Sequence, residues 1–359
     1  MEPCGSPYLT DSERGRATRL NFAHALARWK DRGVEQRTIG RLGRDVSVIG
    51  LGTWQLGADW GEVSESDALA VLDAAVSSGV TFLDTADVYG DGRSEQIIAK
   101  YIAGRTDRPF VATKMGRRVA QELRNYTLAN FRAWTDRSRK NLGMDVLDLV
   151  QLHCPPPSVI SSDEVFDALD TLVAEQRIAA YGVSVETCAE ALAAIARPGV
   201  ATIQIILNAF RRKPLEEVLP AAAAAGVGII ARVPLASGLL SGRYRADTTF
   251  PENDHRNYNR HGEAFDVGET FSGVDYATGV QAAQEFSGLA PAGVTPAQLA
   301  LRWVVQQPGV STVIPGARNV AQAQANSAAA DVAPLSVETL AAVEDLYDKR
   351  IRALVHDKW

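Results

Sequence analysis

Short apolar runs alternate with longer segments of helical periodicity along most of the chain. The apolar runs have the composition of buried parallel strands, which are hydrophobic on both faces. We expect strands at 46–51, 81–83, 110–113, 146–152, 178–183, 200–207, 228–233 and 310–314. The periodic segments predict helices at 64–79, 94–101, 128–142, 163–176, 187–196, 215–225, 319–326 and 337–347.

The boundaries of these elements carry local signals. A hairpin is expected around residues 42–44, leading into the first buried strand. Ser64 followed by Asp67 resembles a capping box, and Gly79 is placed to end that helix. Ser94 is a candidate N-cap for the helix after the second strand. The link before the last strand is long and polar over 243–273, with a helix expected in its later part.

Eight strand–helix units in about 300 residues predict an α/β protein with a (β/α)8 TIM barrel, because such alternation implies parallel strands with right-handed crossovers. A doubly wound open sheet is the alternative, but no G-x-G-x-x-G follows the first strand. No linker divides residues 37–359, so we expect one barrel there. Residues 1–36 are an N-terminal extension, either with a helix over 11–27 or loosely ordered.

Composition excludes several classes of protein. The 359 residues are 46% hydrophobic, enough for a large core, and the net charge of −6 arises from interspersed acids and bases without a basic face for nucleic acid. Three cysteines without C-x-x-C spacing argue against a disulfide scaffold or a metal site. No apolar run suits a membrane span or signal peptide. We therefore expect a soluble cytoplasmic protein. An oligomer is possible, but no pattern supports one.

Four polar side chains follow three consecutive predicted strands. They are Asp84, Tyr89, Lys114 and His153. Each alone has a structural explanation, such as a surface lysine or a capping aspartate. At the carboxyl ends of barrel strands they converge, however, and a lysine beside a tyrosine lowers the phenol pKa from about 10. An aspartate keeps that lysine charged, and a histidine can bind a substrate oxygen. The set predicts proton donation to an oxygen that is becoming an alkoxide.

At this point the chain resembles the aldo-keto reductases from about residue 38 to 326. The motifs are G-L-G-T-W at 50–54, F-L-D-T-A-D-V-Y-G at 82–90, V-A-T-K at 111–114 and D-L-V-Q-L-H at 148–153. The resemblance implies that Asp84, Tyr89, Lys114 and His153 are the catalytic tetrad. It also implies a nicotinamide cofactor at the barrel mouth, preferably NADPH/NADP+, with NADH possible.

The later motifs match cofactor-binding positions of that family. Small residues at 237–239 would offer backbone N–H groups to a pyrophosphate, and Arg318 near a helix N-terminus suits a 2′-phosphate. Ser184 and Gln204 match contacts to the nicotinamide carboxamide. The cofactor-binding residues that the resemblance implies are Thr53, Trp54, Ser184, Gln204, Arg232, Pro234, Leu235, Ser237, Gly238, Leu239, Gly242, Tyr244, Ile314, Gly316, Arg318, Gln322 and Asn326.

Two positions depart from the family pattern. Val185 stands where many members have asparagine, which removes one carboxamide contact. Arg232 stands where an aromatic ring commonly stacks on the nicotinamide, and a planar guanidinium can replace it. Trp54 and Trp60 are candidates for one wall of the substrate pocket, and the 243–273 link for another.

The expected activity is NADPH-dependent reduction of a small aldehyde or ketone, with Tyr89 as general acid. A regulatory subunit that keeps the fold and cofactor but acts through a partner, as potassium-channel β-subunits of this family do, is a second hypothesis. A third is a barrel lyase or isomerase with Lys114 as a Schiff base. That third hypothesis leaves the phosphate-binding motifs without a purpose.

Overall fold

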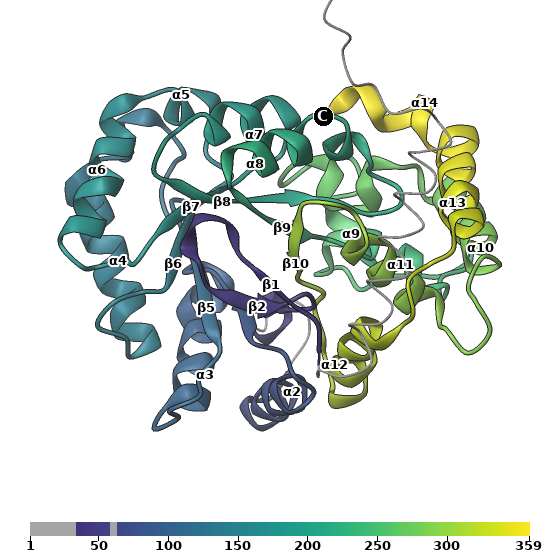
Figure 1. Cartoon of the computed structure of the whole chain (residues 1–359), viewed down its shortest axis with the longest axis horizontal. Coiled ribbons are helices and arrows are strands. Elements are labelled where there is room, and N and C mark those ends of the chain that lie inside the picture. Colours follow the sequence, from purple (N-terminus) through teal and green to yellow (C-terminus); the bar gives the residue numbers. More distant parts are fainter. Residues whose placement is uncertain (1–33, 58–62) are drawn as a thin grey trace, which may run out of the picture.

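Eight parallel strands form the centre of the computed structural model, which describes residues 34–57 and 63–359 (Figure 1). A short antiparallel hairpin, β1 and β2, precedes them. The strands are β1 (Gln36–Thr38), β2 (Asp45–Ser47), β3 (Leu51–Gly52), β4 (Phe82–Asp84), β5 (Phe110–Met115), β6 (Leu149–His153), β7 (Tyr181–Ser184), β8 (Val200–Ile206), β9 (Gly228–Arg232) and β10 (Val310–Val313).

The sheet closes into a barrel. Strands β3 to β10 pair in sequence order, and all pairs are parallel. The first and last strands are joined by parallel bridges, Ile49 with Val313 and Gly52 with Gly316, and Gly50 N donates to Val313 O at 2.8 Å. The barrel prediction is confirmed, and the open doubly wound sheet is wrong. The expected first strand, 46–51, is divided between the hairpin and β3.

Helices surround the barrel on its outside (Figure 1). They are α2 (Glu65–Ser77), α3 (Arg93–Ile102), α4 (Leu128–Leu142), α5 (Pro157–Ile160), α6 (Asp163–Ala174), α7 (Cys188–Ile195), α8 (Val218–Ala225), α9 (His255–Tyr258), α10 (Tyr276–Ser287), α11 (Pro296–Val305), α12 (Val320–Ser327), α13 (Val337–Arg350) and α14 (Arg352–Val355). Among the described residues, none of these helices is long and apolar enough to cross a bilayer.

Some local expectations are corrected. Ser94 is not an N-cap: Gly92 caps α3, and the Ser94 hydroxyl lies inside, hydrogen-bonded to Thr53 and Thr85. Ser64 does cap α2 by accepting from Asp67 N. The link before β10 holds two full helices, α10 and α11, where one was expected. The helix expected over 11–27 lies outside the described residues.

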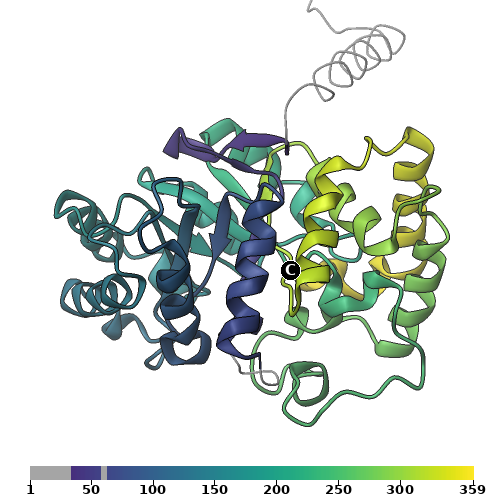
Figure 2. The ribbon, with the colours of Figure 1, turned by 90° about the horizontal axis from the view of Figure 1, so that it is seen from below.

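One end of the barrel is sealed by the hairpin. Ile39 is fully buried there with Phe82, Phe110, Leu149 and Ile230, in a cluster inside the barrel. The next residue, Gly40, has a φ of +47°, and a Cβ would lie 2.3 Å from the backbone nitrogen of Gly228. Only glycine fits this approach. Figure 2 shows the hairpin at the end of the molecule opposite the 243–273 link. The carboxyl ends of the strands are thus left for chemistry.

The last residue of the chain supports the 243–273 link. The Trp359 side chain is buried, and the Arg211 guanidinium lies over its ring at 3.9 Å from the centroid. Trp359 Nε1 donates to Asp266 Oδ1 at 3.2 Å. The ring also lies against Gly268 and Gly273, where an added Cβ would come within 2.8 and 2.5 Å of it. The C-terminal residue therefore fixes the segment 266–273.

Candidate active site

The four residues expected at three strand ends converge. Asp84 ends β4, Lys114 lies near the end of β5, and His153 ends β6. Lys114 Nζ donates to Asp84 Oδ1 at 2.5 Å, to Thr85 O at 2.9 Å and to Tyr89 Oη at 3.5 Å. The Tyr89 and His153 rings meet edge to face, 6.0 Å apart. Their placement together was foreseen from the strand ends.

The turn that carries Tyr89 is held by a glycine contact. Gly90 has a φ of +58°, and a Cβ there would lie 2.0 Å from Gly57 O, so a side chain would force the two turns apart. Gly57 belongs to the 3-10 turn after β3, which also carries Trp54. The Trp54 and Tyr89 rings stack, with centroids 5.9 Å apart and planes at 19°. The glycine contact and the Trp54 ring thus help to fix the position of Tyr89, whose hydroxyl lies 3.5 Å from Lys114 Nζ.

Burial sets the protonation state of the tyrosine. It raises the pKa of Tyr89 above its usual value of 10, and the opposing effect of Lys114 is smaller. The lysine therefore acts in the expected direction, but the expected net lowering of the pKa is wrong for this site. Burial by itself would lower the pKa of Lys114, yet Asp84 and then Tyr89 raise it. The site holds a protonated phenol beside a charged ammonium.

Two glutamines complete the polar core of the site. Gln204 Nε2 donates to Asp84 Oδ2 at 2.8 Å, and Gln151 Nε2 donates to the same oxygen at 3.4 Å. Gln204 was expected only as a cofactor contact, and Gln151 was not singled out. The sequence did contain an indication of Gln151. It lies two residues before His153 on the same strand, and alternate strand residues point to the same face. Both amides fix the carboxylate that holds Lys114.

His153 is neutral at physiological pH. Burial lowers its pKa well below 6.5, and the positive charges of Arg117, Lys114 and Arg232 lower it further. Its Nδ1 finds no hydrogen-bond partner among the described residues. A neutral imidazole here can hydrogen-bond a substrate oxygen but does not supply a proton by ionisation.

A cavity of about 1050 Å³ opens above the tetrad. Asp84, Tyr89 and His153 line it, whereas Lys114 is not in the lining and contacts the lining residues Asp84 and Tyr89. Trp54 forms part of the wall, as expected, and Phe265 of the 243–273 link forms another part. Trp60 lies outside the described residues.

Most residues expected to bind a cofactor line this same cavity. They are Thr53, Trp54, Ser184, Gln204, Arg232, Pro234, Leu235, Ser237, Gly238, Tyr244, Ile314, Gly316, Arg318, Gln322 and Asn326. Leu239 and Gly242 are not in the lining. The Leu239 side chain is fully buried against Gly279 of α10, and Gly242 ends the 3-10 turn Ala236–Ser241.

The far end of the cavity is shaped by two loops. Ser237 and Gly238 have φ values of 56° and 95°, which turn the backbone sharply after β9. At the other loop, Arg318 N donates to Gln322 Oε1 at 2.8 Å, and Asn326 Nδ2 donates to Gly316 O at 3.1 Å. Both side chains of α12 therefore fix the backbone that presents Arg318.

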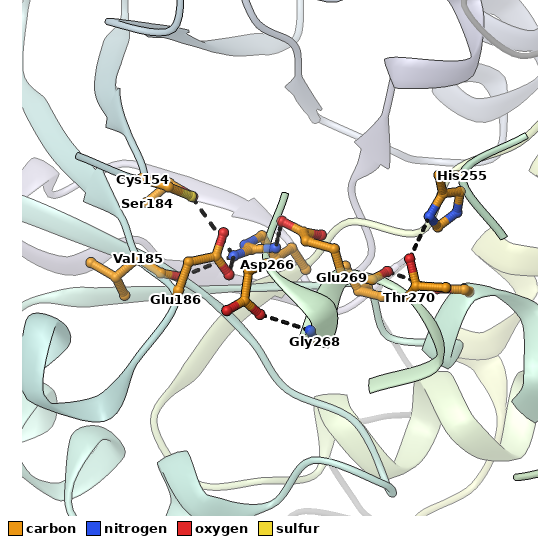
Figure 3. Close-up of polar contacts among 12 residues, drawn as sticks. Cys154, Ser184, Val185, Glu186, His255, Asp266, Gly268, Glu269 and Thr270 are labelled. Carbon is orange, nitrogen blue, oxygen red and sulfur yellow. Dashed lines mark hydrogen bonds and ion pairs between the residues drawn. The ribbon is translucent and has the colours of Figure 1, made fainter. Parts of the chain in front are cut away.

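Arg232 is a heavily bonded cation of the cavity wall. Its guanidinium donates to Glu186 Oε2 at 2.8 Å, to Val185 O at 2.9 Å and to Glu269. Figure 3 shows Glu186 and Glu269 approaching this centre from two segments far apart in the sequence. Burial raises the pKa of Glu186, but Arg232 and Arg211 outweigh it and bring it to about 2. The stacking expected of Arg232 stays a prediction, since this network holds its side chain.

Three ligand-type atoms in that network lie within 4.8 Å of one another, on Cys154, Glu186 and Glu269. The Arg232 guanidinium already bridges both carboxylates. Burial also raises the pKa of the Cys154 thiol to about 12, so it stays protonated and is a poor metal ligand. We interpret the group as an ion-pair network.

Comparison with known proteins agrees with the geometry. A family model described as the Aldo/keto reductase family matches residues 48–348. Aldo-keto reductase YhdN of Bacillus subtilis (strain 168) is 31% identical over 82% of this chain and 88% of its own. A probable voltage-gated potassium channel subunit beta of Arabidopsis thaliana is 30% identical over 84% of this chain and 93% of its own. An aldo-keto reductase from Klebsiella pneumoniae, solved in complex with NADPH, superimposes with a TM-score of 0.65 at 28% identity, covering 88% of this chain and 96% of its own.

Proposed function

Because the chain belongs to the aldo/keto reductase family, we propose that it reduces a small aldehyde or ketone to an alcohol at the expense of NADPH. The observation that carries the proposal is the buried contact of Lys114 with both Asp84 and Tyr89 at the floor of the cavity. This arrangement provides a proton donor whose conjugate base is stabilised by an adjacent cation.

The cavity fits a dinucleotide in both size and chemistry. Its volume of about 1050 Å³ lies at the upper end of ligand pockets, which run from roughly 300 to 1,000 Å³. Ser237 and Gly238 would hold the pyrophosphate through their backbone, and Arg318 would hold the 2′-phosphate. Ser184 and Gln204, at the other end of the lining, would face the nicotinamide. Arg318 is the reason to propose NADPH in preference to NADH.

NADPH bound in this site supplies the hydride. Tyr89 Oη gives its proton to the carbonyl oxygen as negative charge develops there, and the neutral His153 donates a hydrogen bond that orients the same oxygen. The resulting phenolate is stabilised by Lys114, which Asp84 keeps charged. Trp54 stacks on Tyr89 and so helps to hold the phenol ring in place for the proton transfer.

The charge on Lys114 also weighs against a Schiff-base mechanism. A lysine must lose its proton before it attacks a carbonyl, yet the pKa of Lys114 is raised by Asp84 and Tyr89 against the effect of burial. Its Nζ is moreover buried behind Asp84 and Thr85 O. We therefore do not propose a lyase or isomerase.

The test is steady-state oxidation of NADPH with a panel of aldehydes and ketones, comparing wild type, Tyr89→Phe and Tyr276→Phe. Tyr276 is a matched control, since its hydroxyl binds Arg245 O outside the cavity lining. We expect Tyr89→Phe to lose kcat by several orders of magnitude while its Kd for NADPH is kept. Equal turnover by Tyr89→Phe and Tyr276→Phe would refute the role of Tyr89.

The similarity to a potassium channel subunit motivates a second candidate, a cofactor-binding subunit that acts through a protein partner. The two functions differ in turnover. Tight NADPH binding, with a single slow oxidation and no exchange of cofactor in the presence of any carbonyl, would favour the partner-binding function.

A further inference from the structure

Arg117 lies at the catalytic end of the cavity and has no role in the reaction described above. It follows β5 by two residues and lines the cavity together with His153 and Cys154. Its positive charge lowers the pKa of His153, in the same direction as Lys114 and Arg232. Arg117 thus shares the cavity wall with the imidazole that is proposed to orient the carbonyl oxygen.

The hydrogen-bonding capacity of Arg117 is almost unused. Its one ion pair in the described ranges is a 3.6 Å contact between Nη2 and Glu186 Oε1, longer than a hydrogen bond. Its Nε is buried and has no partner there. Glu186 meanwhile gives its other oxygen to Arg232 at 2.8 Å, so the acid is shared between two arginines.

Two other cations of this end have short ion pairs. Lys114 holds Asp84, and Arg232 holds Glu186 and Glu269. Arg211 is the other guanidinium of the network. It is fully buried, with Asp266 at 4.0 Å, and does not line the cavity. Arg117 keeps 26% of its side chain accessible. A ligand in this end of the cavity can therefore reach the Arg117 guanidinium, which still has N–H donors without an acceptor among the described residues.

A carboxylate is the group that such a side chain binds best. The guanidinium fork matches the two carboxylate oxygens, and a charge-assisted pair is stronger at a half-buried site than in water. A neutral apolar aldehyde would cover the accessible guanidinium donors without offering them an acceptor, which is unfavourable.

We propose that the substrate is a short aldehyde or ketone acid, whose carboxylate binds Arg117 while its carbonyl lies between Tyr89 and His153. This inference rests on the proposed carbonyl reductase activity and names its substrate class. Arg117 then determines specificity: it selects the anionic substrate and fixes which end points at the tetrad. Glu186, 3.6 Å from Nη2, helps to position the Arg117 guanidinium.

The experiment compares two substrates of equal length, 4-oxobutanoate and 4-oxobutanamide, with NADPH. We expect wild type to prefer the carboxylate in kcat/KM by at least about tenfold. Arg117→Met should abolish that preference through a higher KM for 4-oxobutanoate, with little change for the amide. Arg117→Lys should keep part of it, because the charge remains and the fork is lost.

Arg124→Met is the matched control. Arg124 belongs to the same connection after β5 but is exposed and paired only with Glu122 in the described residues. It should retain the wild-type preference, which separates the local contact from a general change in charge. Equal kcat/KM for the two substrates in wild type, or a preference unchanged in Arg117→Met, would overturn the proposal. A preference confined to phosphorylated aldehydes, or to neutral glyceraldehyde, would also overturn the assignment to a carboxylate.

A binding measurement separates this proposal from the reductase activity itself. Calorimetric titration of the NADP+-loaded protein with butanoate and with butanamide needs no turnover. Tighter binding of butanoate in wild type, lost in Arg117→Met, supports the carboxylate site even where no carbonyl is reduced. Equal binding of the two overturns it, whatever the outcome of the Tyr89→Phe experiment.

Discussion

Replacement of Lys114 by methionine tests the central electrostatic argument. The substitution keeps the aliphatic bulk and removes the charge 3.5 Å from Tyr89 Oη. At that distance a unit charge stabilises a phenolate by about 5 kcal/mol if the effective dielectric constant is about 20. Asp84, bound to the same ammonium, offsets part of this stabilisation, and proton transfer is incomplete in the transition state. We therefore expect a loss of about 2–4 kcal/mol, or roughly 30- to 1,000-fold in kcat.

The same substitution leaves the Asp84 carboxylate buried without its cation. Breaking a buried ion pair from one side costs about 3–5 kcal/mol of stability. The double variant Lys114→Met/Asp84→Asn removes the unpaired charge, while Gln204 and Gln151 still have an amide oxygen to bind. It should regain most of the lost thermal stability and none of the lost activity.

The assays are NADPH oxidation over a pH series and thermal unfolding of wild type and both variants. Loss of activity in both variants, with stability restored only in the double variant, would support separate roles for the charge in catalysis and in folding. A double variant that recovers wild-type kcat would refute the reasoning, because the lysine would then serve only to pair Asp84.

Three further predictions concern other parts of the molecule. Arg318→Ala should raise the KM for NADPH by roughly ten- to a hundredfold and leave that for NADH unchanged, since only NADPH carries the 2′-phosphate; equal effects on both cofactors would contradict the assignment. Asp87 is buried without hydrogen-bond partners for its carboxyl oxygens among the described residues, and burial, with Glu95, raises its pKa from 3.8 to about 7. A raised acid pKa means that the folded state binds the proton more tightly, so the cost of ionising Asp87 grows between pH 4 and 7 and is complete above 7. Urea unfolding should therefore show Asp87→Asn to be more stable than wild type at pH 8, by up to about 4 kcal/mol, with the difference vanishing near pH 4. Trp359→Ala should lower the free energy of unfolding by about 3 kcal/mol and raise the substrate KM, because the ring supports segment 266–273 and with it Glu269; an unchanged KM would show that the segment holds its place alone.

The sequence by itself determined the barrel and predicted that four polar side chains meet at its mouth. Eight apolar runs, each followed by a helical segment, leave few ways to bury their hydrophobic faces, and a parallel barrel is the simplest. Asp84, Tyr89, Lys114 and His153 then meet, because the ends of consecutive parallel strands lie at the same edge. Such inferences need only local periodicity and the order of elements along the chain.

Only the tertiary structure decided how the charges pair. Arg232 meets Glu186 and Glu269, which are 46 and 37 residues away, and so became part of an ion-pair network rather than a lone planar side chain. Local sequence patterns do not predict these ion-pair partners, since the two glutamates come from separate loops. The protonation state of Tyr89 was likewise set by depth of burial, a property of the whole fold that outweighs the adjacent lysine. The proposed role of Arg117 depends on the tertiary structure for the same reason. Its one carboxylate partner in the described part of the chain lies 3.6 Å away, so most of its N–H donors remain for a substrate.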